Sequence, residues 1–295
     1  MAEKFISERN LKFLLYELND IEALLKYPYF ADHSREVFDM LLDTAMRMGK
    51  ELFKPLFEEM DRKAPEYVGG EVKVHPKVRE IMRAAGEGGW IAATFPYDLG
   101  GQQLPFTVGI MLPTAIFGSA NYSASVYHGL THGAAGLIAS YGTQEMKDAY
   151  LPKMTAGEWQ GTMALTEPQA GSSLTDLTTT ATPTDQGYYK IKGQKLFISA
   201  GDHDGADNVI HLALVRIKDA PPGVKGISLF IVPKKRIRED GSLEPNDLNC
   251  AGIYHKLGYR GAPITQLAFG ENDDCRGWLV GEANKGLAYM FQMMN

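Results

Sequence analysis

The stretch MALTEPQAGSS, residues 163–173, carries the most specific chemical feature of this chain. Its apolar first residues predict a β-strand, and Pro168 ends the strand pairing because proline has no N–H group to donate. Gly171 then allows the backbone to bend, and two serines follow at once. The strand end therefore offers hydroxyls and open N–H groups, which suit a phosphate or a heteroaromatic ring with N and O acceptors.

A second polar strand end follows about thirty residues later along the chain. The run GQKLFISAG, residues 193–201, passes from apolar residues into a serine, an alanine and a glycine. Two such strand ends favour one ligand site between them.

The residues before these motifs predict an all-helical half. Apolar residues recur there at the three-to-four spacing of amphipathic helices, and small residues in the last segment predict close, buried packing. Helices are expected over residues 10–18, from Ser34 towards Phe53, from Pro76 onward, and over the apolar segments 108–117 and 124–139.

After about residue 160 the residue pattern predicts short β-strands instead of helices. Residues 188–192 alternate apolar and polar, while 209–215 and 226–232 are apolar runs bounded by turn residues, as in buried strands. Their regular spacing predicts a compact sheet or barrel. From Asn284 onward the pattern is again helical, with an apolar face through Met290, Phe291 and Met294 that we expect to be exposed. The sequence stops there without a helix-ending signal, so we expect a further helical region.

Length and composition limit the class of protein. A chain of 295 residues should hold about two domains, and 44% hydrophobic with 22% charged residues is ordinary for a soluble globular protein. A net charge of −6 argues against nucleic acid or an anionic membrane as partner. Two cysteines without a CxxC pair fit a reducing cytoplasm. Residues 1–4 lack the order of a secretory signal, and no run reaches a membrane span. The sequence predicts a cytoplasmic protein.

Several flanking motifs, in order, then identify a resemblance. YGT (141–143), YLPK (150–153) and GEW (157–159) lead into TEPQAGS, and GQKLFISAG follows. Together they resemble the acyl-CoA dehydrogenases over the whole chain. RNLKF (9–13), GGW (88–90), HKLG (255–258) and the ending MFQMMN (290–295) resemble a large subgroup that includes 3-methylmercaptopropionyl-CoA dehydrogenase-like proteins.

The resemblance implies the fold and its division into domains. The family has an N-terminal all-α helical domain, a β-barrel-like middle domain and a C-terminal helical bundle. Carried over, residues 1–158 would form the helical domain, 159–282 the flavin-binding β domain, and 283–295 the first turns of the bundle. FAD would lie between the β domain and the bundle.

The resemblance also implies a set of cofactor residues. Thr166 would bond the edge of the flavin ring, and Ser199 would place a hydroxyl near its N5 atom. Phe-Ile-Ser stands where the family usually has Trp-Ile-Thr, and Ser173 replaces a frequent aspartate. Gly171 and Ser172 would approach the pyrophosphate of FAD or the CoA portion of the substrate. The full set is Met163, Leu165, Thr166, Gly171, Ser172, Phe197, Ile198 and Ser199.

The implied reaction is α,β-dehydrogenation of an acyl-CoA to the trans-2-enoyl-CoA, with hydride transfer to flavin N5. The implied partners are an acyl-CoA, an electron-accepting flavoprotein and, at full length, further copies of the chain. The family's catalytic base is a glutamate of the C-terminal bundle, so the base is expected beyond Asn295 and the 295-residue form is expected to be inactive. No carboxylate of this chain, including Glu167, matches the position of the base.

Other interpretations compete with this one. His128 and His132, at i and i+4, could hold a metal, but packing or the wall of a substrate channel is favoured. Residues 202–207 resemble a calcium loop only weakly. Glu167 is expected to be structural. The whole protein could be a non-catalytic flavin- or acyl-CoA-binding relative, or a flavin oxidase or monooxygenase.

Overall fold

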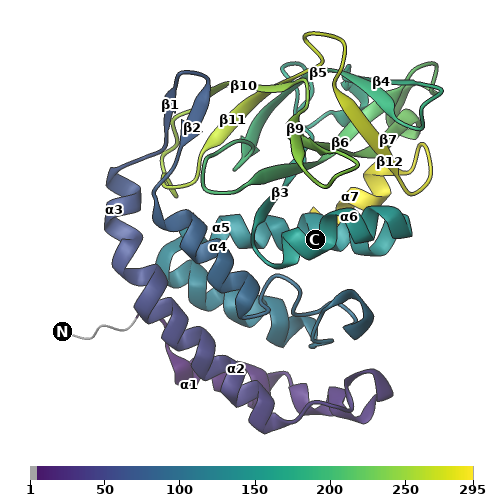
Figure 1. The fold of residues 1–295 in the computed structure, drawn as a ribbon. Helices are drawn as coiled ribbons and strands as arrows, with labels where there is room; N and C mark the ends of the chain where they lie inside the picture. The colour runs from purple at the N-terminus through teal and green to yellow at the C-terminus, as the bar shows by residue number, and fades with distance from the viewer. Residues whose placement is uncertain (1–4, 295) are drawn as a thin grey trace.

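Helices of the first half pack side by side beneath a β domain (Figure 1). The computed structural model describes residues 5–294; residues 1–4 and Asn295, with the predictions that fall on them, lie outside this range. The α-helices are α1 (Glu8–Lys12), α2 (Arg35–Met48), α3 (Phe57–Arg62), α4 (Lys77–Glu87), α5 (Leu112–Tyr141), α6 (Gln144–Thr155) and α7 (Gly286–Met294).

Shorter helical turns of π and 3₁₀ type join these helices. They are η1 (Phe13–Leu18), η2 (Ile21–Lys26), η3 (Pro28–Phe30), η4 (Gly49–Phe53), η5 (Lys54–Leu56), η6 (Tyr97–Leu99), η7 (Thr107–Met111), η8 (Leu174–Asp176) and η9 (Gly223–Gly226).

The second helix begins where the sequence predicts. The Ser34 hydroxyl accepts from the Val37 N–H at 3.4 Å, a side-chain cap that satisfies one open donor of the first turn. The helix continues through η4 to Phe53, as predicted, and α4 starts directly after Pro76. Both predictions are confirmed.

The two apolar segments predicted as separate helices are continuous in the structure. Residues 108–111 lie in η7, and the rest of both segments forms a single bent helix, α5. Asn121 has extended dihedral angles inside it (φ −164°, ψ 95°), and its side-chain oxygen accepts from the Ala124 N–H at 3.2 Å. Asn121 therefore caps the second half of α5 from within. Its amide nitrogen lies 3.3 Å from the Phe53 carbonyl oxygen, which fixes the bend against η4.

The middle domain is built from strands that close on themselves. Strand β4 pairs with both β5 and β6, and the ladders β5–β12, β12–β7 and β7–β6 complete the ring. The barrel-like domain predicted from the resemblance is confirmed. Its strands and the neighbours that extend them are β3 (Trp159–Ala164), β4 (Thr180–Pro183), β5 (Tyr189–Ser199), β6 (Asn208–Ile217), β7 (Ile227–Pro233), β10 (Leu248–Ile253), β11 (Ile264–Phe269) and β12 (Arg276–Val280).

Two small hairpins lie outside this ring and were not predicted. One pairs β1 (Glu66–Val68) with β2 (Glu71–Lys73), and the other pairs β8 (Lys235–Ile237) with β9 (Leu243–Pro245). The first lies beside β10 (Figure 1), where the Tyr67 hydroxyl donates to the Cys250 carbonyl at 2.7 Å.

The last helix corrects one expectation. Met290 is fully buried, because α7 packs against α5 and β7. Tyr289 stacks on Tyr141 with ring centroids 4.0 Å apart. The large side chains of Phe291 and Met294 on the predicted apolar face stay exposed, at 45% and 49%. No helix within residues 5–294 has the length and apolar character needed to cross a bilayer.

Candidate functional site

The two polar strand ends meet, as the sequence predicts. The Leu196 N–H donates to the Thr166 carbonyl at 2.8 Å, which ties the end of β3 to the end of β5. The hydroxyls of Thr166 and Ser199 are both partly exposed. Within residues 5–294 neither hydroxyl has a hydrogen-bond partner. Both hydroxyls are thus available to a ligand.

The loop after β3 adds further donors. The Glu167 N–H donates to the Ala170 carbonyl at 2.8 Å, and the reverse bond is 3.1 Å, which closes a tight turn. Gly171 and Ser172 follow this turn on the surface. Their backbone N–H groups have no partner within the described chain. Adjacent open N–H groups of this kind favour an anion.

Strand β5 carries a bulge just before Ser199. Opposite β11 the pairing shifts from Lys195 to Ile198, and Phe197 between them has a left-handed φ of 58°. This conformation is costly for a bulky residue and turns its side chain outward. The Phe197 ring is 53% exposed and lies 4.8 Å from the ring of Tyr254. An aromatic surface therefore flanks the free hydroxyl of Ser199.

Two of the predicted cofactor residues point the other way. Leu165 and Ile198 are 8% and 2% exposed, and each packs in a hydrophobic core. Any contact they make with a ligand would come from the backbone. Met163 is partly buried and faces the same cavity as Ser199.

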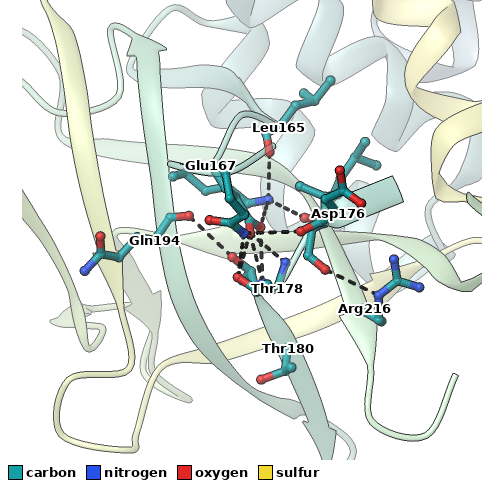
Figure 2. Close-up of polar contacts among 12 residues, drawn as sticks. Leu165, Glu167, Asp176, Thr178, Thr180, Gln194 and Arg216 are labelled. Carbon is teal, nitrogen blue, oxygen red and sulfur yellow. Dashed lines mark hydrogen bonds and ion pairs between the residues drawn. The ribbon is translucent and has the colours of Figure 1, made fainter. Parts of the chain in front are cut away.

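The buried carboxylate of Glu167 fixes the loop after β3 through hydrogen bonds to the segment around Thr178 (Figure 2). Glu167 accepts from the Thr178 N–H at 2.7 Å and from the Thr179 N–H at 3.2 Å. Its side chain is 1% exposed. Glu167 is structural, as predicted: it fixes the turn that presents Gly171 and Ser172.

Lys195 is the cation that balances Glu167, and sequence reasoning missed its role. Its Nζ lies 2.8 Å from Glu167 Oε1 and donates to the carbonyls of Leu165 and Leu214, at 2.9 and 2.6 Å. Burial lowers the pKa of Lys195 to about 8, against the attraction of Glu167. Burial alone would raise the pKa of Glu167, but Lys195 and the N–H donors hold that pKa below its usual range. The pair is ionised at neutral pH and ties both strand ends together.

A cavity of ≈ 530 Å³ opens beside these strand ends. Met163 and Ser199 form one side, both arms of the bent helix α5 form its wall, and the end of α7 closes part of it. Its volume is typical of a small-molecule site. No Asp, Glu, Lys or Arg of the described residues lines it.

His128 and His132 lie in the wall of this cavity. His132 Nδ1 lies 2.8 Å from the Ile91 carbonyl oxygen, so this nitrogen carries the proton. Burial lowers the pKa of both imidazoles, that of His128 to about 4. Residues 5–294 contain no group of three or more His, Cys, Asp or Glu side chains placed to hold a metal. Both rings are neutral wall groups.

Comparison with known proteins decides the family. The sequence profile of the acyl-CoA dehydrogenase N-terminal domain matches residues 36–158, and that of the middle domain matches residues 162–271. The chain belongs to the acyl-CoA dehydrogenase family. The predicted domain boundaries after residues 158 and 282 stay predictions.

Curated acyl-CoA dehydrogenases cover this chain almost completely. A butyryl-CoA dehydrogenase of Syntrophomonas wolfei is 38% identical over 97% of the chain. A 3-methylmercaptopropionyl-CoA dehydrogenase of Ruegeria pomeroyi is also 38% identical over 97%. These matches agree with the subgroup indicated by the sequence. The chain spans only 48% of the length of each relative.

Solved acyl-CoA dehydrogenases share the fold. The structure from Geobacillus kaustophilus has a TM-score of 0.70 at 26% identity and covers 89% of this chain and 62% of its own. One from Bacillus anthracis, complexed with FAD, has a TM-score of 0.69 at 25% identity and covers 90% and 41%.

The site of this acyl-CoA dehydrogenase chain offers donors that suit a dinucleotide flavin. The open N–H groups of Gly171 and Ser172 suit its pyrophosphate, and the free hydroxyls of Thr166 and Ser199 suit its ring edge. The flavin ring is uncharged, so its binding does not require a charged side chain in the cavity. The residues present therefore fit FAD.

The weakly calcium-like loop instead forms ion pairs in this acyl-CoA dehydrogenase chain. It borders a second cavity of ≈ 490 Å³ on the side of the β1–β2 hairpin. Buried Asp202 pairs with Lys234, and Asp207 pairs with Arg79. The Lys234 side chain is itself partly buried.

Proposed function

We propose that the full-length protein carrying this chain is an FAD-dependent acyl-CoA dehydrogenase, which converts an acyl-CoA to the trans-2-enoyl-CoA. The supporting observation is the pair of unpartnered hydroxyls, Thr166 and Ser199, beside an uncharged cavity. The relatives named for butyryl-CoA and 3-methylmercaptopropionyl-CoA support an acyl-CoA substrate. The electrons leave to an acceptor flavoprotein.

In this proposal the strand ends hold the cofactor. Thr166 and Ser199 bond the edge of the ring, Phe197 packs on it, and the N–H groups of Gly171 and Ser172 bind the pyrophosphate. Met163 and the backbone of Leu165 and Ile198 complete the wall, and Ser172 also approaches the CoA. FAD, when bound, supplies a two-electron acceptor for the β-hydrogen.

The cavity holds the acyl group in this proposal. Its lining of apolar residues with a few neutral polar groups suits an uncharged acyl chain. Hydrogen-bond donors near the thioester carbonyl would stabilise the enolate-like charge as the α-proton leaves.

The base that takes the α-proton is proposed to come from outside the described residues. No carboxylate of residues 5–294 lines the cavity. The pKa of His128, about 4, makes it a weak base at neutral pH. Glu167 is buried and committed to Lys195. This is also the observation that favours the second candidate, a relative that binds flavin or acyl-CoA without catalysis.

Turnover distinguishes the two candidates. The full-length gene product is expected to purify with flavin and to reduce a dye acceptor when given a short-chain acyl-CoA. The 295-residue chain alone is expected to bind FAD weakly and to show no turnover, because no carboxylate of residues 5–294 lines its cavity. A full-length protein that binds flavin without turnover would favour the non-catalytic relative, and peroxide release would favour an oxidase. Turnover by the 295-residue chain would contradict the assignment of the base.

Removing the strand-end hydroxyls should weaken flavin binding. Thr166→Val and Ser199→Ala each remove one proposed hydrogen bond, so each should raise the Kd for FAD by up to about tenfold. Fluorescence titration of the apoprotein measures the change. The exposed Ser119→Ala is the matched control and should leave the Kd unchanged. Unchanged Kd values in both site variants would contradict the placement of the ring.

A further inference from the structure

The cavity wall contains one hydrogen-bond acceptor whose identity the fold fixes. His132 donates through Nδ1 to the Ile91 carbonyl at 2.8 Å, so in the neutral ring Nε2 carries a lone pair and no proton. The ring is held in place by stacking on Phe95, with centroids 5.5 Å apart. Nε2 has no partner within the described chain. The ring therefore offers this lone pair to an occupant of the cavity.

A second imidazole lies one helical turn away on the same wall. The His128 ring packs edge-on against Phe53 and Phe117, at 5.9 and 5.5 Å between centroids. Its Nε2 is buried without a partner, which leaves Nδ1 as the nitrogen able to meet the cavity. Positions i and i+4 place the two Cβ atoms about 5–6 Å apart. The two imidazoles therefore face the cavity from neighbouring turns of α5.

The lining residues that the structure describes disfavour a charged occupant. Among residues 5–294 no lysine or arginine lines the cavity. A carboxylate there would find no cation among these residues and would meet the lone pair of His132, so its binding is disfavoured. A purely apolar chain would leave that lone pair without a donor.

We propose that the cavity selects an uncharged acyl group bearing a hydroxyl, which donates to His132 Nε2 and bonds His128 Nδ1. A hydroxyl both donates and accepts, so it satisfies His128 in either tautomer. A thioether or a methyl group cannot donate to His132. This inference rests on the proposed function and adds the substrate class.

Binding tests the inference without requiring turnover. The probes are hexanoyl-CoA, its 4-, 5- and 6-hydroxy derivatives, and the carboxylate-ended adipoyl-CoA, titrated calorimetrically into the full-length protein at neutral pH. At least one hydroxy derivative is expected to bind roughly tenfold tighter than hexanoyl-CoA, with adipoyl-CoA the weakest. His132→Phe keeps the ring stack on Phe95 and removes the acceptor, so the preference should fall to about one.

The variants keep the test decisive. His128→Phe should also reduce the preference for the hydroxy derivative over hexanoyl-CoA. This variant replaces His132→Phe as the test if His132→Phe does not fold. The exposed His255→Phe is the matched control and should retain the full preference. Equal binding of hexanoyl-CoA and all hydroxy derivatives overturns the inference alone. If no CoA thioester binds, the proposed function itself fails.

Discussion

Replacement of Glu167 by alanine is expected to lower the free energy of unfolding by about 3–5 kcal/mol. The substitution leaves the Lys195 ammonium in the core, with its side chain 0% exposed, and removes its only anionic partner within the described chain. It also removes the acceptor of the Thr178 and Thr179 N–H groups, at 2.7 and 3.2 Å. Urea unfolding at neutral pH, followed by circular dichroism, measures the loss.

Two further proteins separate the charge from the packing. Glu167→Gln keeps an acceptor for the N–H groups but leaves Lys195 unpaired, so it should still destabilise strongly. Adding Lys195→Met should recover part of the loss, because the double variant contains no buried charge. The exposed pair of Glu282 and Lys285 provides the control, and Glu282→Ala should cost at most about 1 kcal/mol. A Glu167→Ala loss as small as that of the control would contradict the role assigned to the pair.

The same pair explains why the loop has its shape. Lys195 bonds the carbonyl of Leu165 at 2.9 Å, immediately before Thr166, while Glu167 is held immediately after it. The free hydroxyl of Thr166 is thus fixed on both sides by a buried ion pair. We expect a variant that loses the pair to lose flavin affinity even where it remains folded.

Local signals in the sequence were sufficient for the elements and for part of the site. Ser34 before an amphipathic run, Pro76 at a helix start and the apolar runs of β6 and β7 each act over a few residues, so they could be predicted. The meeting of the two strand ends followed from their shared polar pattern.

Features that depend on long-range packing could not be predicted. Lys195 looks like an ordinary strand lysine until Glu167, 28 residues away, is placed beside it. Met290 appears exposed until α5 and β7 cover it. The left-handed Phe197 gives no sequence signal, because the bulge arises from the register with β11. A buried position for Lys195 is suggested only by its spacing of four residues from buried Ile191, which places both on one face of the strand.

Three buried histidines are expected to make the fold sensitive to acid. Burial lowers the pKa of His128 to about 4 and those of His203 and His211 to about 3. In the unfolded chain each titrates near its usual pKa of 6.5, so the unfolded state binds more protons as the pH falls below that value. Stability is therefore fully present above about pH 6.5 and is lost progressively towards pH 4.

The expected loss is large relative to the stability of a domain. At pH 5 each histidine should cost about 2 kcal/mol, or about 6 kcal/mol together, against a typical total of 5–15 kcal/mol. Urea unfolding at pH 7.5 and pH 5 measures the difference. His211 contacts the Thr162 hydroxyl at 2.7 Å and His203 accepts from the Gly205 N–H at 3.1 Å, so glutamine, which keeps an acceptor, is the substitution to use. Each of His203→Gln and His211→Gln should reduce the pH dependence by about one proton, while the exposed Ser119→Ala should leave it unchanged. Equal stability of the unmodified chain at the two pH values would show that these rings do not stay neutral in the core.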